Sequence, residues 1–281
     1  MMTQCGLRMC IGNSLIQHGH LNDRVYVMKL DPEDIPDIIP FADSLALKER
    51  YSKIFVRVPE SSAETFAGAG YSAEATVPFF FRGKDAAVFM AKYPDPGRNK
   101  VTHATAIAGV LSAAIGYAGK PFSHEQLPKG FSLTQAHTGD AKEIAALFRT
   151  VFKTHPYPGF DPDYIRESMQ GQVRYFIIRN SRQLAAVASC EVDEESRNVE
   201  MTDLATGPLF RGRGFAGMLL HAMEKDMKNE GVLLAHTIAR AIFQPINAVF
   251  AGAGYQFGGL LPNDINICGS LESMNVWYKK V

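Results

Sequence analysis

The chain has 281 residues, of which 46% are hydrophobic and 21% are charged, as in an ordinary soluble globular protein. Lysine plus arginine equals aspartate plus glutamate at 29 each, so the net charge is zero and general binding to nucleic acid is disfavoured. The four cysteines show no CxxC spacing, which argues against a zinc site or a disulfide framework. The first 20 residues lack the pattern of a signal peptide. We therefore expect a cytoplasmic protein without a bound metal.

The first third of the chain predicts strands alternating with helices, from runs of apolar, β-branched and aromatic residues and from the helical spacing of others. Strands are expected at 24–30, 51–58, 71–81 and 86–93, and helices at 35–50 and 59–70. The stretch His18-Gly19-His20 has no acidic or thiol partner at helix spacing nearby. We expect a polar turn there and no metal site.

A linker follows this first unit. Its start is marked by the proline- and glycine-rich YPDPGRN at 93–99, and KPFSHEQLPKG at 120–130 ends it. The intervening stretch 101–120 consists largely of alanine, glycine and short apolar residues, but it is short for a membrane span. We expect a small-residue helix packed on protein. The predicted organisation is a first domain at 1–93, a linker at 94–129 and a second domain at 130–281.

The second domain repeats the order of elements seen in the first. A strand at 197–206 leads into a turn at 207–214, and apolar residues from Phe215 to Met227 then recur at helical spacing. Gly231 stands where a C-terminal helix cap is expected. Further elements are a strand at 232–239, a helix from Gln244 with Pro245 in its first turn, a strand from Tyr255, and a last strand at 273–279.

The hexapeptide FAGAGY occurs at 66–71 and again at 250–255. Each copy is expected to end a helix and begin a strand, with glycine supplying the left-handed turn. Identical residues at the same place in the same order of elements favour a duplicated half-fold over chance. The halves differ at one loop, because Asp31 and Asp34 lie near a helix start in the first half, where the second half has a glycine-rich turn. A negative loop repels phosphate, so we expect anion binding in the second half alone.

The glycine-rich turn is RGRGFA at 211–216, which leaves a strand and opens a helix. Gly212 and Gly214 allow a tight turn, and the free N–H groups at the helix start favour a phosphate or pyrophosphate. Arg211 and Arg213 add positive charge. A solvated basic turn is the alternative, but the position between a strand and an amphipathic helix favours an anion site.

This turn also carries a family resemblance. Arg211, Gly214 and Ala216 match the pyrophosphate-loop pattern Gln/Arg-x-x-Gly-x-Gly/Ala of the GCN5-related N-acetyltransferases, the GNAT family. The later helix resembles that family through an asparagine, an aromatic residue and a Gly-aromatic pair, which are Asn247, Phe250, Gly254 and Tyr255. The resemblance covers about residues 130–281. Within it, 131–152 is similar to the opening strand and helix of the family, and 173–179 with 184–192 to its first hairpin.

The resemblance implies an α/β (α+β) fold with a mixed, mostly antiparallel central sheet flanked by helices, preceded by a partial GNAT-like N-terminal domain. It also implies acetyl-CoA as co-substrate, with the pyrophosphate on the turn and the thioester carbonyl against backbone N–H groups of the preceding strand. The residues expected to contact acetyl-CoA are Leu204, Ala205, Thr206, Arg211, Gly212, Arg213, Gly214, Phe215, Ala216, Asn247 and Phe250.

The finer pattern EMTDLAT…RGRG…TIARA…NICGSLESMNVWYK is similar to family members that acetylate β-lysine. This implies transfer to the terminal N6 amine, with the compatible solute N6-acetyl-β-lysine as product. Lysine, a polyamine, an aminoglycoside and a protein lysine are alternative acceptors, and a non-catalytic CoA-binding domain is an alternative of another class. The expected partner is a small-molecule amine, with neither nucleic acid nor membrane, and a homo-oligomer is left open.

The reaction requires a proton acceptor, because an alkylammonium with a pKa near 10.4 must lose a proton before it attacks. Glu200 and Asp203 lie on the strand before the turn, on opposite faces unless a bulge intervenes. Glu200 precedes Arg211 by eleven residues, the offset at which members that acetylate histone lysine carry their base glutamate. We favour Glu200 as the base, with Asp203 as the alternative or as an ammonium-binding residue.

One residue departs from the family pattern. Phe250 stands where many members have a tyrosine that protonates the departing thiolate. Tyr255, Cys268 or water would replace it, or the thiolate would leave unassisted, since a CoA thiol is a good leaving group.

The amines and carboxylate of β-lysine call for opposed charges in the substrate pocket. Arg240 is expected to pair with the carboxylate, with a surface arginine as the alternative. Asp264 and Glu272 are expected to receive the 3-amino group.

Overall fold

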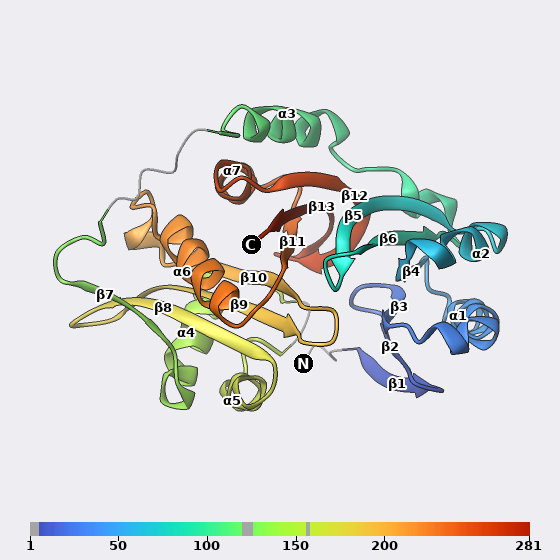
Figure 1. Ribbon diagram of the computed structural model, residues 1–281, viewed down its shortest axis with the longest axis horizontal. Helices are drawn as coiled ribbons and strands as arrows, with labels where there is room; N and C mark the ends of the chain where they lie inside the picture. The colour runs from blue at the N-terminus through green and yellow to red at the C-terminus, as the bar shows by residue number, and fades with distance from the viewer. Residues whose placement is uncertain (1–5, 120–125, 156–157) are drawn as a thin grey trace.

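The computed structural model describes residues 6–119, 126–155 and 158–281. In these residues thirteen strands form one continuous sheet, in the order β1-β2-β3-β4-β6-β5-β12-β13-β11-β10-β9-β8-β7, with helices against its faces (Figure 1). Across the described ranges, no helix combines the length and hydropathy that a membrane crossing needs. The same residues contain no cluster of three or more side chains suited to hold a metal ion.

The elements of the first half are β1 (Leu7–Ile11), β2 (Ser14–Gly19), β3 (Arg24–Lys29), α1 (Ile35–Glu49), β4 (Lys53–Pro59), α2 (Ala63–Gly68), β5 (Ser72–Phe81) and β6 (Asp85–Lys92). The predicted strands and helices are present, and the hairpin β1–β2 is an addition. The polar turn expected at 18–20 is wrong for His18 and Gly19, which belong to β2, whereas His20 begins the turn that follows. His18 lies in β2, where alternate residues are buried, and its Nδ1 is 3.0 Å from the Tyr51 hydroxyl.

The helix α3 (Ala104–Ile115) connects the halves, and the second half contains β7 (Phe131–Gln135), α4 (Ala141–Val151), α5 (Pro162–Gln170), β8 (Val173–Asn180), β9 (Leu184–Asp193), β10 (Asn198–Thr206), α6 (Phe215–Asn229), β11 (Leu234–Arg240), α7 (Gln244–Gly252), β12 (Gln256–Ile267) and β13 (Ser270–Lys280). As predicted, α3 packs on protein, because it lies against α7 (Figure 1). Residues 120–125, which belong to the predicted helix stretch and to the end of the linker, lie outside the described residues.

The two halves of the sheet share one connectivity. In the first half β3 pairs with β4 in parallel, and β6 pairs antiparallel with both β4 and β5. In the second half β10 pairs with β11 in parallel, and β13 pairs antiparallel with both β11 and β12. The halves meet edge to edge through β5 and β12, where Ala75 pairs with Gly259.

The two FAGAGY copies have the same geometry. In the first, Tyr71 N donates to Phe66 O at 3.1 Å, and in the second Tyr255 N donates to Phe250 O at 3.0 Å. The two aromatic rings of each copy meet edge to face, with centroids 5.2 Å and 5.0 Å apart. The last glycine of each copy is left-handed, with φ of +89° and +86°. This Schellman-type helix stop turns the chain into the next strand.

A buried ionic cluster joins the halves. Asp264 on β12 forms ion pairs with Arg24 on β3 and with Lys53 on β4, the latter at 2.9 Å. Lys53 is fully buried and also contacts Glu74 on β5 at 3.0 Å. Burial alone would raise the pKa of Asp264, but Arg24 and Lys53 hold it below its ordinary value. The N-terminal half is therefore held to the second half by paired charges as well as by the sheet.

The repeated helix stop makes a stability prediction. Gly70→Ala and Gly254→Ala should each lower the free energy of unfolding by about 1 kcal/mol, because an L residue is strained at positive φ. A Cβ has room at both positions, so the cost is conformational rather than steric. Urea unfolding of each variant measures it.

Gly68→Ala is the matched control within the same hexapeptide. Gly68 ends α2 outside the left-handed region, and a Cβ there meets no atom within 4 Å. Alanine should leave the stability unchanged or raise it, since alanine favours a helix over glycine. Equal losses in all three variants would contradict this account of the helix stop.

Candidate functional site

The candidate site lies where the parallel strands β10 and β11 separate. The pairing of β10 with β11 spans Asn198–Glu200 and Leu234–His236 and ends there, although β10 continues to Thr206 and β11 to Arg240. Each strand keeps its outer neighbour to its end, so a gap opens between the two. Facing strand edges present N–H and C=O groups to an extended ligand that enters such a gap.

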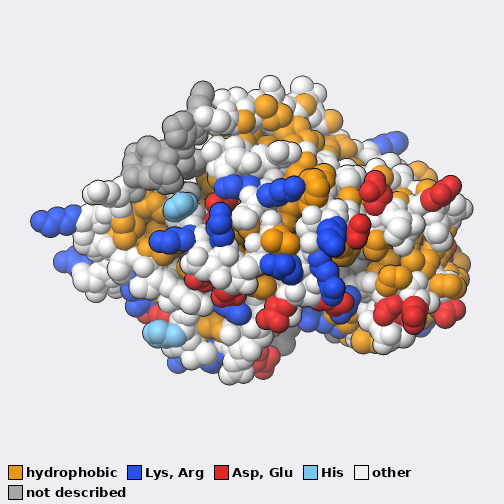
Figure 2. Space-filling view, in the orientation of Figure 1, with side chains coloured by type: hydrophobic (Ala, Val, Ile, Leu, Met, Phe, Trp, Pro, Cys, Tyr) orange, Lys and Arg blue, Asp and Glu red, His pale blue; other side chains and the backbone are white. Residues whose placement is uncertain are grey.

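A cavity of about 1510 Å³ lies at this gap, and both halves of the chain line it. The second half contributes the ends of β10 and β11, the turn at 211–216 and the start of α6. The first half contributes one face of β2, β3 and β4. Lys and Arg side chains gather across the middle of the molecule in Figure 2, whereas acidic ones gather at the end where α1 and α2 lie.

The glycine-rich turn has the predicted form. A short 3-10 turn at Pro208–Phe210 precedes it, and α6 begins at Phe215. Gly212 and Gly214 are left-handed, with φ of +76° and +72°. Residues 211–214 are exposed and line the cavity. The exposed N–H groups at the start of a fifteen-residue helix suit a phosphate group.

A bulge lies in the strand before the turn. The register of β10 against β9 shifts between Thr202 and Ala205, and Asp203 within this interval has a φ of +52°. The alternation of faces is therefore broken between Glu200 and Asp203, the exception that the sequence analysis allowed for. Leu204 and Thr206 line the cavity beyond the bulge.

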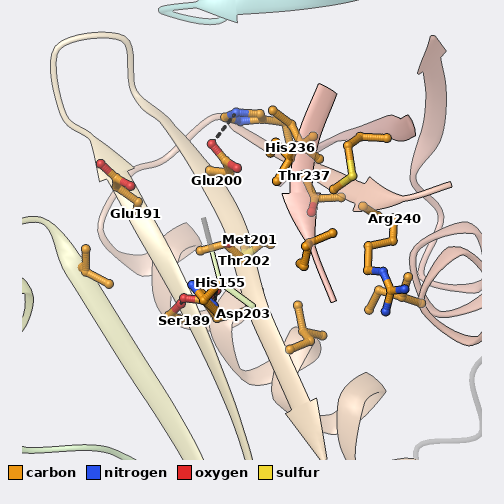
Figure 3. Close-up of a pocket in the computed structure, with 18 of the residues that line it drawn as sticks. His155, Ser189, Glu191, Glu200, Met201, Thr202, Asp203, His236, Thr237 and Arg240 are labelled. Carbon is orange, nitrogen blue, oxygen red and sulfur yellow. Dashed lines mark hydrogen bonds and ion pairs between the residues drawn. The ribbon is translucent and has the colours of Figure 1, made fainter. Parts of the chain in front are cut away.

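Glu200 lies at the point where the strands part, with 31% of its side chain exposed. Its Oε2 is 3.7 Å from Nε2 of His236, too far for a hydrogen bond (Figure 3). The cavity walls shield Glu200 from bulk water and raise its pKa to about 7, helped by Glu191 and opposed by Arg57. A carboxyl group with this pKa takes up and releases protons near neutral pH.

His236 is not the proton carrier. It is 1% exposed, and burial, together with the charge of Arg57, lowers its pKa to about 3. The ring is therefore neutral, and it packs edge to face against Phe80 at a centroid distance of 4.9 Å. Its position on β11 opposite Glu200 makes it part of the apolar surroundings that raise the pKa of Glu200.

Asp203 is held by neighbouring side chains. Its Oδ2 accepts a hydrogen bond from Ser189 Oγ at 2.9 Å, and its Oδ1 is 3.2 Å from His155 Nε2 (Figure 3). Its side chain is 7% exposed. These contacts make Asp203 less available than Glu200 to a substrate amine, and its role as alternative base stays a prediction.

Asn247 has a structural role in this fold. It is fully buried, and its Nδ2 donates to the carbonyls of Arg240 and Phe243, both at 2.9 Å. Its Oδ1 accepts from Asn275 Nδ2 at 2.8 Å and Trp277 Nε1 at 3.0 Å. With these four hydrogen bonds its amide is satisfied, and it is absent from the described lining of the cavity. This arrangement does not favour the expected contact of Asn247 with acetyl-CoA.

Phe250 is fully buried yet borders the cavity. Neither Tyr255 nor Cys268, the two side chains considered as its replacement in protonating the thiolate, belongs to the described cavity lining. Tyr255 is 3% exposed within the core beneath α6 and α7, and burial raises its pKa well above the ordinary value. Of the options that the sequence left open, protonation by water and unassisted departure of the thiolate therefore remain.

The three residues expected to contact the substrate all have ionic partners. Arg240 forms a bidentate pair with Glu272, at 2.8 Å from Nε to Oε2 and 2.7 Å from Nη2 to Oε1. Asp264 is 1% exposed within the ionic cluster that joins the halves. The expected pairing of Arg240 with a substrate carboxylate would have to displace Glu272. These substrate contacts stay predictions, and the geometry argues for other residues.

The structure also brings in residues that sequence reasoning missed. Glu191 on β9 is the cross-strand partner of Glu200, and Arg57 on β4 lines the same cavity. Their distance from the glycine-rich turn in sequence hid them, and Arg57 lies in the half for which only the absence of an acetyl-CoA site was expected. The alternation of charge with apolar residues in KIFVRV was the available signal, since it leaves Lys53 and Arg57 on one face of β4.

Comparison with known proteins agrees with this geometry. Residues 142–244 match the Acetyltransferase (GNAT) family. The chain is 36% identical to the beta-lysine N(6)-acetyltransferase of Methanococcus maripaludis, with 96% of this chain and 97% of that one covered. It is 30% identical to N-acetyltransferase YodP of Bacillus subtilis, with 95% and 96% covered. It is also 30% identical to the beta-lysine N(6)-acetyltransferase of Methanosarcina mazei, with 84% and 94% covered. From this similarity over nearly its whole length, we conclude that the chain is an N-acetyltransferase of the GNAT family.

Proposed function

We propose that the protein transfers the acetyl group of acetyl-CoA to the N6 amine of β-lysine and so forms N6-acetyl-β-lysine, a compatible solute. The observation that carries the proposal is the meeting of three features at one cavity. These are the parted strands β10 and β11, the anion-binding turn at 211–216, and Glu200 with a pKa of about 7. Two relatives, which cover 96% and 84% of this chain, bear the name of this reaction.

Enzymes of this family use acetyl-CoA, and the cavity offers matching groups. The turn would hold the pyrophosphate through N–H groups at the start of α6, aided by Arg211 and Arg213. The pantetheine arm would lie along the open edge of β10, where N–H groups near Leu204–Thr206 would polarise the thioester carbonyl. An open strand edge suits a long co-substrate, and a turn with glycine at 212 and 214 lets a phosphate group approach the backbone.

In the reaction, the substrate ammonium gives one proton to Glu200, directly or through water. The free amine nitrogen then bonds to the thioester carbon, the carbon–sulfur bond breaks, and the nitrogen gives its second proton to water. The thiolate takes up a proton from water, since the cavity holds no tyrosine at position 250. The net reaction releases one proton per amide formed.

We also propose that residues 1–93 are a partial acetyltransferase half that binds no acetyl-CoA. The matching strand connectivity and the two identical helix stops support a duplication. At the helix start of this half, the Asp34 carboxylate accepts hydrogen bonds from the N–H groups of Asn13 and Ser14, both at 2.8 Å. A carboxylate of the chain itself thus lies where the second half presents its anion-binding turn.

The first test concerns the turn. Gly214→Leu should raise the KM for acetyl-CoA at least tenfold and change the KM for β-lysine little, because a side chain there displaces the pyrophosphate from the helix start. Gly254→Leu is the matched control, since it carries the same left-handed strain away from the described cavity. Steady-state kinetics with each substrate varied in turn separate the two. An equal rise in both KM values would count against this acetyl-CoA site.

The second test concerns the base. Glu200→Gln keeps the shape and loses the proton acceptor, so kcat should fall by about 10² to 10⁴ while both KM values change little. In the wild type, kcat/KM should rise through a step near pH 7, where Glu200 becomes ionised. The variant should lose that step and regain activity at high pH as free amine accumulates.

Asp203→Asn is the comparison variant for this test. If Asp203 only supports the site through Ser189 and His155, its pH–rate profile should keep the step near pH 7. Wild-type turnover in Glu200→Gln, with a pH-rescued loss in Asp203→Asn, would reverse the assignment.

The third test uses stability rather than activity. The folded-state pKa of Glu200, about 7, exceeds the ordinary 4.5, so the protonated carboxyl stabilises the fold at low pH and this contribution is lost as the pH rises through 7. Glutamine stays neutral throughout. The Tm of Glu200→Gln should therefore exceed that of the wild type at pH 8 and approach it at pH 5. Thermal unfolding followed by circular dichroism measures both, and a difference that did not change with pH would refute the raised pKa.

A further inference from the structure

The N-terminal half turns one face of its sheet toward the active-site cavity. On β3 and β4, Val25, Val27, Ile54, Val56 and Val58 belong to the core cluster with α1 and α2. The alternate residues of the same strands, Arg24, Tyr26, Phe55 and Arg57, line the cavity. A strand buries alternate residues on opposite faces, so the half without an acetyl-CoA loop still supplies a wall of the site.

Arg57 stands out on this wall. Its side chain is half-buried, and among the described residues no carboxylate or other acceptor lies within ion-pair or hydrogen-bond distance of its guanidinium. The Cζ atom lies over the ring of Phe80 at 4.6 Å from its centroid. Phe80 contacts His236, whose ring approaches Glu200. The rings of Phe80 and His236 therefore lie one after the other between Arg57 and the proposed base.

The other basic residues of the wall differ from Arg57 in having partners. Arg24 pairs with Asp264, and Lys29 pairs with Glu195 at 3.1 Å. Arg8 donates a hydrogen bond to the Tyr164 hydroxyl. Arg240, across the cavity, is neutralised by its bidentate pair with Glu272.

The guanidinium of Arg57, with N–H donors that are unpaired within the described ranges and lie next to the ring of Phe80, is suited to bind a planar anion. Its N–H groups match the two oxygens of a carboxylate in a bidentate pair, and a cavity strengthens that pair relative to water. Opposite charge lines the same cavity, because Glu191 and Glu200 are direct cross-strand neighbours on β9 and β10, and the charge of Arg57 opposes the rise in the pKa of each. A cation beside two carboxylates is complementary to a molecule that carries both an amine and a carboxylate.

We propose that Arg57 binds the carboxylate of the substrate, so that the N-terminal half selects an amino acid over a simple polyamine as acetyl acceptor. This inference rests on the proposed function and deepens it, since β-lysine is an amino acid. It assigns to Arg57 the role expected of Arg240. It also gives the degenerate half a function, the recognition of one end of the acceptor.

The test compares two acceptors that differ in the carboxylate alone. β-Lysine and 1,4-diaminopentane have the same terminal amine, and the diamine is β-lysine without its carboxyl group. The wild type should prefer β-lysine by about 10- to 100-fold in kcat/KM, the worth of a charged hydrogen-bonded pair. Arg57→Gln should remove this preference by lowering kcat/KM for β-lysine while changing that for the diamine less than threefold. Arg57→Lys should keep part of the preference, because it retains the charge without the bidentate geometry.

The diamine also separates carboxylate binding from other effects of Arg57. Arg57 lowers the pKa of Glu200, and a changed base would alter the turnover of both acceptors alike. Equal losses for both acceptors, or no loss for either, would overturn the proposal. Lys48→Gln is the matched control, because it removes an exposed positive charge from α1 on the same half, outside the described cavity lining. It should leave the preference unchanged.

Two readouts keep the result clear if the variant folds poorly or if the proposed function fails. Acetyl-CoA binding by isothermal titration calorimetry should be the same for Arg57→Gln and the wild type, which verifies folding. In the wild type alone, the 1-carboxamide of β-lysine should be acetylated as poorly as the diamine, and equal use of acid and amide would refute carboxylate recognition without any variant. Wild-type protein that acetylates neither acceptor would refute the proposed function instead.

Discussion

The buried interface between the two halves, with the carboxylate of Asp264 at its ionic centre, fixes their arrangement. In the sheet β5 and β12 pair at Ala75 and Gly259, and an apolar cluster that includes Phe55 and Phe80 of the first half and Leu261 and Met274 of the second spans the join. Asp264 adds ion pairs to Arg24 and Lys53, and it lies at 1% exposure. Removing one member would leave buried charge unpaired, which costs several kcal/mol. The cluster thus holds the face of β3 and β4 against the cavity.

The connectivity that the two halves share and the helix starts at which they differ together explain the shape of the site. Both halves use the same helix stop and the same strand order, so they meet edge to edge as equivalent units. They differ at the helix start. The second half presents exposed N–H groups and two left-handed glycines, whereas the first half fills the equivalent place with Asp34. The first half lines the cavity with side chains of β2, β3 and β4 instead.

The pKa values and pairing of the carboxylates in the cavity depend on which side chains lie next to each of them. Glu200 and Glu191 oppose one another across two strands, and shielding from water keeps the pKa of both above the ordinary value. Asp203, three residues along, is directed by the bulge to Ser189 and His155. Two carboxylates of one strand are thereby given different surroundings, and the one with the raised pKa is suited to exchange protons at neutral pH.

The sequence alone determined the local features, which depend on residues that are neighbours along the chain. Periodicity and turn chemistry placed the strands and helices, the FAGAGY stops and the turn at 211–216, because these depend on backbone preferences within a few residues. Only the tertiary structure decided which charged and polar side chains are free to bind a ligand. Arg240 and Glu272 lie 32 residues apart and neutralise each other, and Asn247 is satisfied by Asn275 and Trp277. Arg57 reaches the cavity from another half of the chain. The pairing of a charge is set by distance in space, and no local pattern encodes that distance.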